Sequence, residues 1–357
     1  MNELSTTCPH FGACSGCSME KNFEHPPIWC DIKEFFGNSE LVCGKLVHWR
    51  TRAKLAIRGQ CKDPRIGLFR SGSHEVEPIP ECQAHHRSIN RAVEILKEAI
   101  GKENIHIYDE KTGTLRYAQC FVDLATGKVQ LVLVVQSNDS SLNRLCAQLL
   151  KTDHWHSLWI NVQPAHTNVI LGEEWIHVWG EPFLWQELSG RKFPFHPGAF
   201  AQAHWTLFEQ VANQVVAWVP NGAKFIEIYA GVGAMGILAS EKTESTDLVE
   251  NNPYSFLSFK ELNANIKYHL GDAKSAIPLL EAADCVLVDP PRKGLDPLLL
   301  EALQSFSGTL IYLSCDFHSF KRDANRLLES GWTLETGKGY LLFPGTNHVE
   351  TLALFKK

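Results

Sequence analysis

The carboxyl-terminal half of the chain alternates short apolar runs with longer amphipathic segments. Apolar runs around 224–228, 246–250, 286–288 and 310–313 each stop abruptly at polar or breaker residues. Runs of this kind are typical of buried parallel strands whose carboxyl ends open onto a site. We therefore predict a Rossmann-like α/β domain over residues 191–357, in which parallel strands alternate with helices.

Residues 1–190 have a different pattern and form a predicted α+β domain. In the segment 50–58, basic residues alternate with apolar ones, which indicates a strand with one charged face. The pattern also predicts helices over 85–100 and 139–152 and strands over 116–124, 128–136, 158–163 and 175–179. Two prolines and a glycine in 193–198 mark the boundary between the domains.

Length and composition favour a two-domain cytoplasmic protein. A chain of 357 residues is too long for one ordinary core, and its apolar fraction of 44% suits globular packing. The sequence shows no signal peptide and no apolar run of the roughly 20 residues that a membrane-spanning helix needs. We expect a cytoplasmic monomer without membrane contacts.

Charge is unevenly distributed along the chain. The net charge of -6 argues against a protein that binds nucleic acid over its whole surface. Residues 45–70, however, contain eight Lys and Arg residues and one acidic residue, Asp63. This segment predicts a local surface that attracts anions, with Arg50, Arg52 and Lys54 expected to contact phosphates.

Eleven cysteines is a high number for a cytoplasmic protein, so metal binding or thiol chemistry explains several of them better than disulfides do. Cys8, Cys14 and Cys17 follow a C-x5-C-x2-C spacing that lets thiolates converge on one centre. Four cysteines make a [4Fe-4S] site, and we choose Cys82 as the fourth ligand. The competing fourth ligands are Cys30, Cys43 and Cys61, and zinc is the alternative metal.

A strand, a glycine turn and a helix over 224–240 predict a cofactor site. Glu227, Glu250 and Asp272 lie on or just after three successive predicted strands. Carboxylates suit S-adenosylmethionine, which carries a sulfonium cation and no phosphate. The Gly-x-Gly pattern also fits dinucleotide-binding folds, and each acid alone could simply be solvated at a loop end.

Cys315 ends another apolar run, directly before a helical pattern over 319–329. A helix start favours a thiolate, and Arg322 is a candidate to assist it, so Cys315 is a candidate nucleophile.

The motifs together resemble those of the bacterial RNA uracil-5 methyltransferases that make 5-methyluridine, and the likeness runs from Cys8 to Leu354. The matching segments are Cys8/Cys14/Cys17/Cys82, 198–202, 229–233, 289–294, Ser314-Cys315 and 348–350. The resemblance implies a domain with a [4Fe-4S] cluster, an S-adenosylmethionine-dependent methyltransferase domain and an RNA substrate. It also implies that Gln202, Tyr229, Glu250 and Asp289 bind the cofactor, that Cys315 is the nucleophile and that Glu350 is the base.

Cluster-bearing bacterial members of this family act mostly on ribosomal RNA, so 23S rRNA is the expected substrate, with tRNA as the alternative. The chemistry would be addition of Cys315 to C6 of uracil, methyl transfer to C5 and removal of the C5 proton by Glu350. The sequence departs from the family at Asp316 and Leu341, where Asn and an acidic residue are common. We also expect the chain to lack the small β-barrel that begins many members.

Two other functions compete with this interpretation. An amino-group methyltransferase would use a related Asp-Pro-Pro-aromatic motif, but Arg292 stands where the aromatic residue belongs and Cys315 follows on the next strand. A non-catalytic iron-sulfur protein that binds RNA would keep the fold without the reaction.

Overall fold

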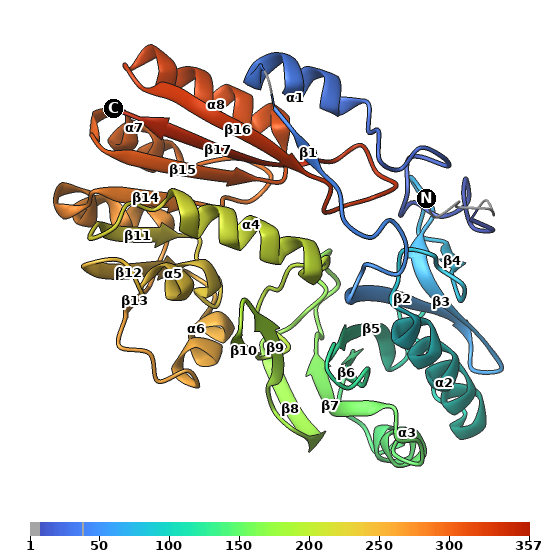
Figure 1. Ribbon diagram of the computed structural model, residues 1–357. Helices are drawn as coiled ribbons and strands as arrows, with labels where there is room; N and C mark the ends of the chain where they lie inside the picture. Colours follow the sequence, from blue (N-terminus) through green and yellow to red (C-terminus); the bar gives the residue numbers. More distant parts are fainter. Residues whose placement is uncertain (1–7, 38) are drawn as a thin grey trace. The chain divides into compact units, whose positions relative to one another are not determined.

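The computed structural model describes residues 8–37 and 39–357, and the chain divides into two compact units. Unit 1 contains the described part of Met1–Lys21 together with Leu46–Gln186, and unit 2 contains Asn22–Lys45 and Glu187–Lys357. Figure 1 shows the elements coloured along the sequence. The segment 22–45, which we expected in the amino-terminal domain, therefore packs with the carboxyl-terminal unit.

Unit 1 is built on a seven-stranded sheet with the order β4-β3-β2-β5-β6-β7-β8. All neighbours are antiparallel except β6 and β7, which α3 connects in parallel. The strands are β2 (Arg52–Gln60), β3 (Asp63–Phe69), β4 (Val76–Pro78), β5 (Leu115–Val122), β6 (Val129–Val135), β7 (Trp155–Val162) and β8 (Glu174–Gly180).

The core of unit 1 lies between this sheet and the helices α2 (Arg87–Glu103) and α3 (Ser141–Leu149). Every residue of β5 and β6 is buried, which explains why these strands read as near-continuous apolar runs. A turn at Thr126-Gly127 joins them, with Gly127 in the left-handed region at φ 72°. The predicted α+β pattern of this unit is confirmed.

Unit 2 is built on an eight-stranded sheet with the order β1-β16-β17-β15-β14-β11-β12-β13. Strands β11 to β15 pair in parallel, whereas β17 is antiparallel to both of its neighbours. This is the Rossmann-like arrangement that the sequence predicts. Its strands are β1 (Leu41–Val42), β11 (Lys224–Ile228), β12 (Ser245–Glu250), β13 (Lys267–Leu270), β14 (Cys285–Val288), β15 (Thr309–Ser314), β16 (Thr333–Tyr340) and β17 (Glu350–Lys356).

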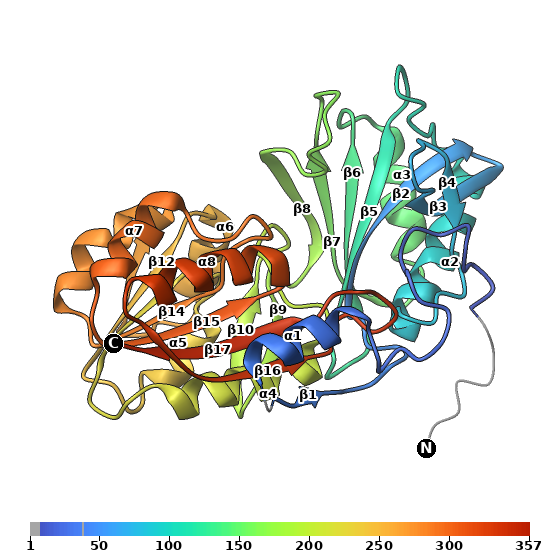
Figure 2. The same ribbon diagram turned by 90° about the horizontal axis from the view of Figure 1, so that it is seen from above.

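Helices cover both faces of this sheet. Figure 2 shows α7 (Pro297–Ser305) and α8 (Phe317–Glu329) on one side and α4 (Trp205–Trp218) on the other. On the first side, α1 (Ile28–Phe36) and the 3-10 helix η1 (Ala273–Ala282) complete one apolar core. Helices α5 (Ala234–Ala239) and α6 (Pro253–Lys260) and the hairpin of β9 (Leu184–Leu188) and β10 (Arg191–Phe195) are the remaining elements. No helix of the described residues is long and apolar enough to cross a membrane.

The strand order fixes where a ligand can bind in unit 2. Strand β11 lies between β12 and β14. The strands β12 and β13 lie on one side of β11, and the later strands β14 and β15 lie on the other, so the strand order reverses at β11. In open α/β sheets, ligands bind outside the carboxyl ends of the strands at such a reversal. Because β17 runs the other way, its first residue, Glu350, lies at this same edge, one position from the pair Ser314–Thr351.

Candidate active site

A strained glycine turn forms the floor of the site. Tyr229 follows β11 in the left-handed region at φ 63°, and Gly231 and Gly233 follow at 56° and 79°. Such a conformation costs a non-glycine residue on the order of 1–3 kcal/mol, and it persists where surrounding contacts impose it. A Cβ atom on Gly233 would lie 2.4 Å from Leu248 Cδ1, so the turn packs directly on β12. The chain thus turns sharply into α5 and leaves its backbone open to a ligand.

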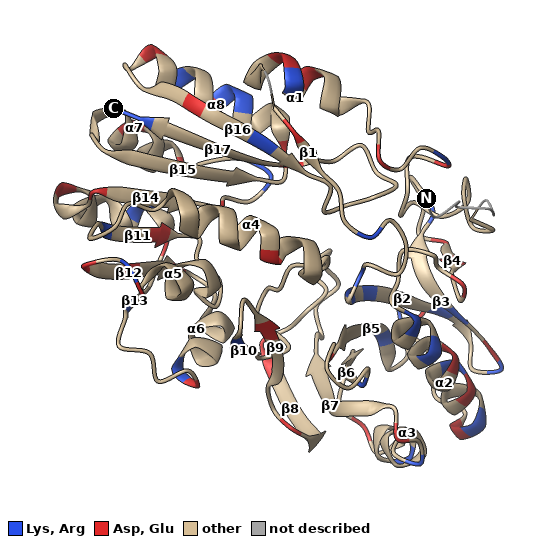
Figure 3. Cartoon of the chain, in the orientation of Figure 1, with Lys and Arg blue, Asp and Glu red and all other residues tan. Residues whose placement is uncertain are grey.

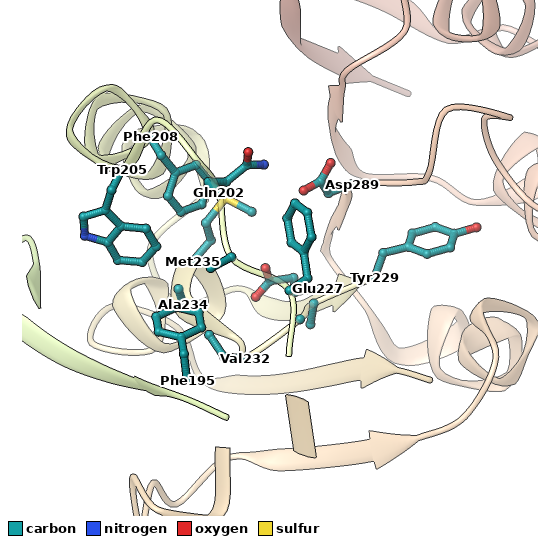
Figure 4. Close-up of a pocket in the computed structure, with 14 residues that line it drawn as sticks. Phe195, Gln202, Trp205, Phe208, Glu227, Tyr229, Val232, Ala234, Met235 and Asp289 are labelled. Carbon is teal, nitrogen blue, oxygen red and sulfur yellow. The ribbon is translucent and has the colours of Figure 1, made fainter. Parts of the chain in front are cut away.

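An open pocket lies above this turn. Figure 4 shows the polar side chains of Gln202, Glu227 and Asp289 around it, while Tyr229 lines it from one side with its ring directed away. Its apolar wall includes the large side chains of Phe195, Phe200, Trp205, Phe208 and Met235. The structure therefore brings three of the four predicted cofactor residues, Gln202, Tyr229 and Asp289, to one pocket.

Glu227 is the most deeply buried acid of this pocket, with 1% of its surface exposed. Its Oε2 accepts a hydrogen bond of 2.6 Å from the backbone N–H of Gly236, so the carboxyl group holds the first turn of α5. Burial raises its pKa to about 8, against the lowering effect of that hydrogen bond. Glu227 therefore both fixes the first turn of α5 and places an acidic group in the pocket.

Glu250, the fourth predicted cofactor residue, lies behind the glycine turn. Its Oε2 accepts from Gly231 N–H at 3.0 Å, and its Oε1 accepts from the N–H groups of Asn251 and Asn252 at 2.9 and 2.7 Å. The carboxylate therefore ties the end of β12 to the turn after β11. Asp272 is exposed and lies beside Lys274, at 3.8 Å, outside the residues that line the pocket.

A second group of residues meets at the same sheet edge. Cys315 follows β15, Asp289 follows β14 and Glu350 begins β17. Glu350 is fully buried, and both of its carboxyl oxygens lack a hydrogen-bond partner among the described residues. An unsatisfied buried carboxyl group costs free energy of folding, so its placement here indicates a chemical role.

Burial and neighbouring carboxylates raise the pKa values of all three groups. Burial, then the charges of Glu350 and Asp289, raises the pKa of the Cys315 thiol to about 12. Burial and the charge of Glu250 raise the pKa of Asp289 to about 7, and burial with the charge of Asp289 raises that of Glu350. The sequence predicted a thiolate favoured by the start of α8, whereas in this structure burial raises the pKa of the thiol.

Arg292 is the nearby cation that sequence reasoning missed. Its charge lowers the pKa values of both Cys315 and Glu350. The predicted helper, Arg322, instead donates its Nε–H to Asp323 Oδ1 at 2.9 Å and an Nη2–H to the carbonyl of Lys293 at 2.8 Å. The position of Arg292 directly after Asp289-Pro-Pro was the available signal.

Asp316, one of the departures from the family pattern, caps α8. Its side chain accepts a hydrogen bond from Ser319 N–H at 2.9 Å, a role that Asn performs equally well. Leu341, the other departure, is fully buried.

The four predicted cluster ligands of unit 1 are close enough to affect one another. Cys82, Cys14 and Cys8 all raise the pKa of Cys17, after burial, and together these effects bring it to about 11. Cys82 accepts backbone hydrogen bonds from His85 and Ala84. Across 8–37 and 39–357, however, no three His, Cys, Asp or Glu side chains are arranged so as to hold a metal ion.

The basic segment 45–70 is partly used inside unit 1. The guanidinium of Arg50 stacks on Trp49 at 4.7 Å, and that of Arg52 on Phe121 at 5.2 Å. Arg70 pairs with Glu77 at 2.7 Å. Figure 3 shows the Lys and Arg residues of β2, of which Lys54 is exposed. The segment is therefore less open to anions than its composition predicts.

Comparison with known proteins places these features in context. The family model described as tRNA (Uracil-5-)-methyltransferase matches residues 276–357. An uncharacterized RNA methyltransferase of Protochlamydia amoebophila is 41% identical over 380 aligned positions, covering 100% of this chain and 99% of the relative. One of Geobacter sulfurreducens is 28% identical and covers 98% and 77%, respectively.

Among solved structures, the chain resembles the Pyrococcus abyssi tRNA (uracil-54, C5)-methyltransferase in complex with S-adenosyl-L-homocysteine. The TM-score is 0.80 at 25% identity, covering 96% of this chain and 86% of that one.

The raised pKa of Glu227 predicts a pH-dependent stability of the ligand-free protein. Between its ordinary pKa of 4.5 and about 8, the folded protein keeps a proton that the unfolded chain releases, so stability falls as pH rises. Glu227→Gln cannot ionise but can still accept from Gly236. We expect thermal unfolding midpoints from about pH 5 to about pH 8 to decline less in this variant, which should be the more stable protein at about pH 8.

Glu261→Gln, at an exposed position, serves as the matched control and should follow the parent curve. Parallel curves for the parent protein and Glu227→Gln would refute the assignment.

Proposed function

The chain belongs to the bacterial RNA uracil-5 methyltransferase family, and on that premise we propose that it methylates carbon 5 of a uridine in 23S ribosomal RNA. It is an RNA (uracil-5-)-methyltransferase that depends on S-adenosylmethionine. The proposal concerns the RNA, the residue roles and the mechanism. The observation that carries it is the buried carboxyl group of Glu350 beside Cys315, which has no hydrogen-bond partner among the residues that the structure describes.

For the cofactor, we assign Gln202, Tyr229, Glu250 and Asp289 as binding residues. When bound, S-adenosylmethionine supplies a methyl group on a positively charged sulfur. The residues fit such a ligand, because acidic groups and an apolar wall line the same pocket and a cation lowers the pKa of nearby acids. Glu250 also accepts from the N–H of Gly231 in the turn and from the N–H groups of Asn251 and Asn252 after β12, which keeps the pocket floor in place.

The first step activates the uracil ring. Carbon 5 is a weak nucleophile until a thiolate adds across the 5,6 double bond. With a pKa of about 12, the Cys315 thiol holds its proton at rest and must lose it as the substrate binds. Asp289, with a pKa of about 7, is the carboxylate suited to accept that proton near neutral pH. The sulfur then bonds to C6, and the electron pair moves to the ring as an enolate.

In the later steps, C5 takes the methyl group and then loses its proton to Glu350. The electron pair of the C5–H bond re-forms the double bond and expels the Cys315 thiolate. A carboxylate with a raised pKa is a stronger base than an ordinary glutamate, and both of its oxygens are free of other hydrogen bonds in the described structure. Arg292 lowers the pKa values of Cys315 and Glu350 and so favours the two anions that the mechanism needs.

The target uridine must leave its base stack to reach groups this deep in the sheet edge. We place it in ribosomal RNA because the family members that carry the Cys8/Cys14/Cys17/Cys82 pattern act mostly on that RNA. Transfer RNA is the second candidate, since the Pyrococcus abyssi neighbour is titled a tRNA methyltransferase and the matching family model is named for tRNA.

We also propose that Cys8, Cys14, Cys17 and Cys82 hold a [4Fe-4S] cluster. Burial and the charges of neighbouring thiolates raise the pKa values of Cys14, Cys17 and Cys82, so this is a donor set that suits iron, which takes thiolates and so removes that repulsion. The thiols do not form a ready metal site in the described structure, so binding requires them to close in. The cluster would hold the amino-terminal segment on the sheet of unit 1.

The mechanism predicts different failures for the two active-site residues. Cys315→Ala should form no covalent complex with RNA and transfer no methyl group. Glu350→Gln should add and methylate but accumulate a methylated protein–RNA adduct, because elimination lacks its base. Adducts that survive denaturant in a gel, with their mass, report both outcomes.

Cys30→Ala is the control for that experiment, since its thiol is exposed on α1. Normal turnover by Glu350→Gln, or 5-methyluridine formed by Cys315→Ala, would be incompatible with the mechanism.

The cluster proposal predicts brown protein with about four irons per chain after anaerobic purification. Cys82→Ser should lose the colour and most of the iron, whereas Cys30→Ser or Cys61→Ser should keep both. Metal analysis and the visible absorption spectrum test this. About one zinc per chain and no iron would show that the site binds zinc instead.

The substrate proposal predicts that deleting the gene removes one 5-methyluridine from 23S rRNA and leaves tRNA unchanged. Mass mapping of nuclease fragments from both RNAs, with and without the gene, gives the position. Restoring the gene with Cys315→Ala should not restore the modification. Loss confined to tRNA would select the second candidate.

A further inference from the structure

The loop over residues 289–296 carries part of the active site. It begins at Asp289, directly after β14, and passes through Arg292. It ends at Asp296, whose side chain accepts from Leu298 N–H at 2.9 Å and so caps α7. The acidity of Cys315 depends on both Asp289 and Arg292, so the position of this loop matters for chemistry.

Asp323, on α8, is the residue that holds this loop. Its side chain is fully buried and lies among four donors. Oδ2 accepts from the N–H of Leu295 at 2.8 Å and from the hydroxyl of Tyr312 at 2.9 Å, while Oδ1 accepts from Arg322 Nε–H at 2.9 Å and pairs with Nη2 at 2.8 Å. One carboxylate thus joins the loop, strand β15 and helix α8.

Arg322 and Gly294 complete the contact. An Nη2–H of Arg322 also donates to the carbonyl of Lys293 at 2.8 Å. Gly294 has φ +84°, and a Cβ atom there would lie 2.4 Å from Arg322 Nη2 and 2.5 Å from Asp323 Oδ2. The loop therefore packs against this ion pair so closely that only glycine fits.

The other end of the loop is tied to the cofactor pocket. The backbone N–H of Asp296 donates to the hydroxyl of Tyr229 at 3.1 Å. Tyr229 is the strained residue that lines the pocket. The segment between Asp289 and Asp296 is thus held at Lys293 and Leu295 by α8 and at Asp296 by the turn after β11.

We propose that Asp323, supported by Arg322, is a positioning residue that fixes the 289–296 loop against the strand and helix that flank Cys315. The proposal rests on the assignment of Cys315 as nucleophile under the proposed function. Losing a fully buried carboxylate would leave the donors of the loop and of β15 without their acceptor, so a carboxylate that serves this many donors is a rigid anchor. Tyr312 lies three positions before Cys315 on the same chain segment, and α8 begins two positions after it. Asp323 therefore fixes the position of the loop relative to Cys315, because it binds both the strand and the helix that adjoin Cys315 in the chain.

Asp323→Asn tests this role, because an amide has one acceptor oxygen where the carboxylate serves four donors. We expect the single-turnover rate of methyl transfer to fall by about tenfold or more, since small misplacements cost large factors in rate. Affinity for S-adenosylhomocysteine, measured by calorimetry, should change by a smaller factor. Cys315 should react faster with iodoacetamide, by about threefold or more in peptide mass analysis, because a released loop exposes the thiol.

If Asp323→Asn folds poorly, Arg322→Gln provides a second test, because the Arg322 side chain is 55% exposed. This variant should also slow methyl transfer and speed the alkylation of Cys315, by smaller factors. Arg326→Gln, exposed on the same helix, should match the parent. Unchanged alkylation and transfer rates in Asp323→Asn would overturn the proposal, as would equal losses of rate and cofactor affinity. A parent protein that transfers no methyl group would instead refute the proposed function, while the alkylation comparison would still decide whether Asp323 fixes the loop.

Discussion

The convergence of strand ends at one edge of the unit 2 sheet is the constraint on which the rest of the site depends. Parallel strands present their carboxyl ends together, and the reversal between β12 and β14 opens a crevice there. The antiparallel strand β17 adds its first residue to the same edge. A cofactor pocket, a thiol and a carboxyl group from distant parts of the sequence meet without any long insertion.

Burying several acidic side chains at this edge costs free energy of folding. Glu227, Glu350 and Asp289 are acids whose pKa values are raised, mainly because burial disfavours their charged forms. A fold selected only for stability would replace such groups with apolar ones of similar size. Their presence near the strand ends fits a site suited to proton transfer. When a nearby charge changes, the ionised carboxylates, which burial disfavours, can act as bases.

The sequence predicted most of the strands of unit 2, because a short apolar run that ends at polar or breaker residues can be recognised from neighbouring residues alone. It also brought Cys315, Asp289 and Glu350 into one hypothesis, although through a resemblance rather than through spacing. It missed α1 and β1, since β1 has two residues and exists only through pairing with β16 far along the chain. It also missed the effects of Arg292 and of burial on the pKa of Cys315, because both depend on tertiary contacts.

The segment 22–45 makes unit 2 discontinuous in sequence. Strand β1 pairs with β16, the ring of Phe36 fills the space that a side chain at Gly337 would take, and Trp29 does the same at Gly339. The backbone N–H of Ile28 donates to Asn347 Oδ1 at 2.8 Å, in the loop that leads to Glu350. On the ribosome, this early segment must therefore wait for nearly the whole chain before its partners exist. The catalytic unit matures late in synthesis, and a fragment cut at Glu187 would leave the edge of β16 uncovered and prone to intermolecular strand pairing.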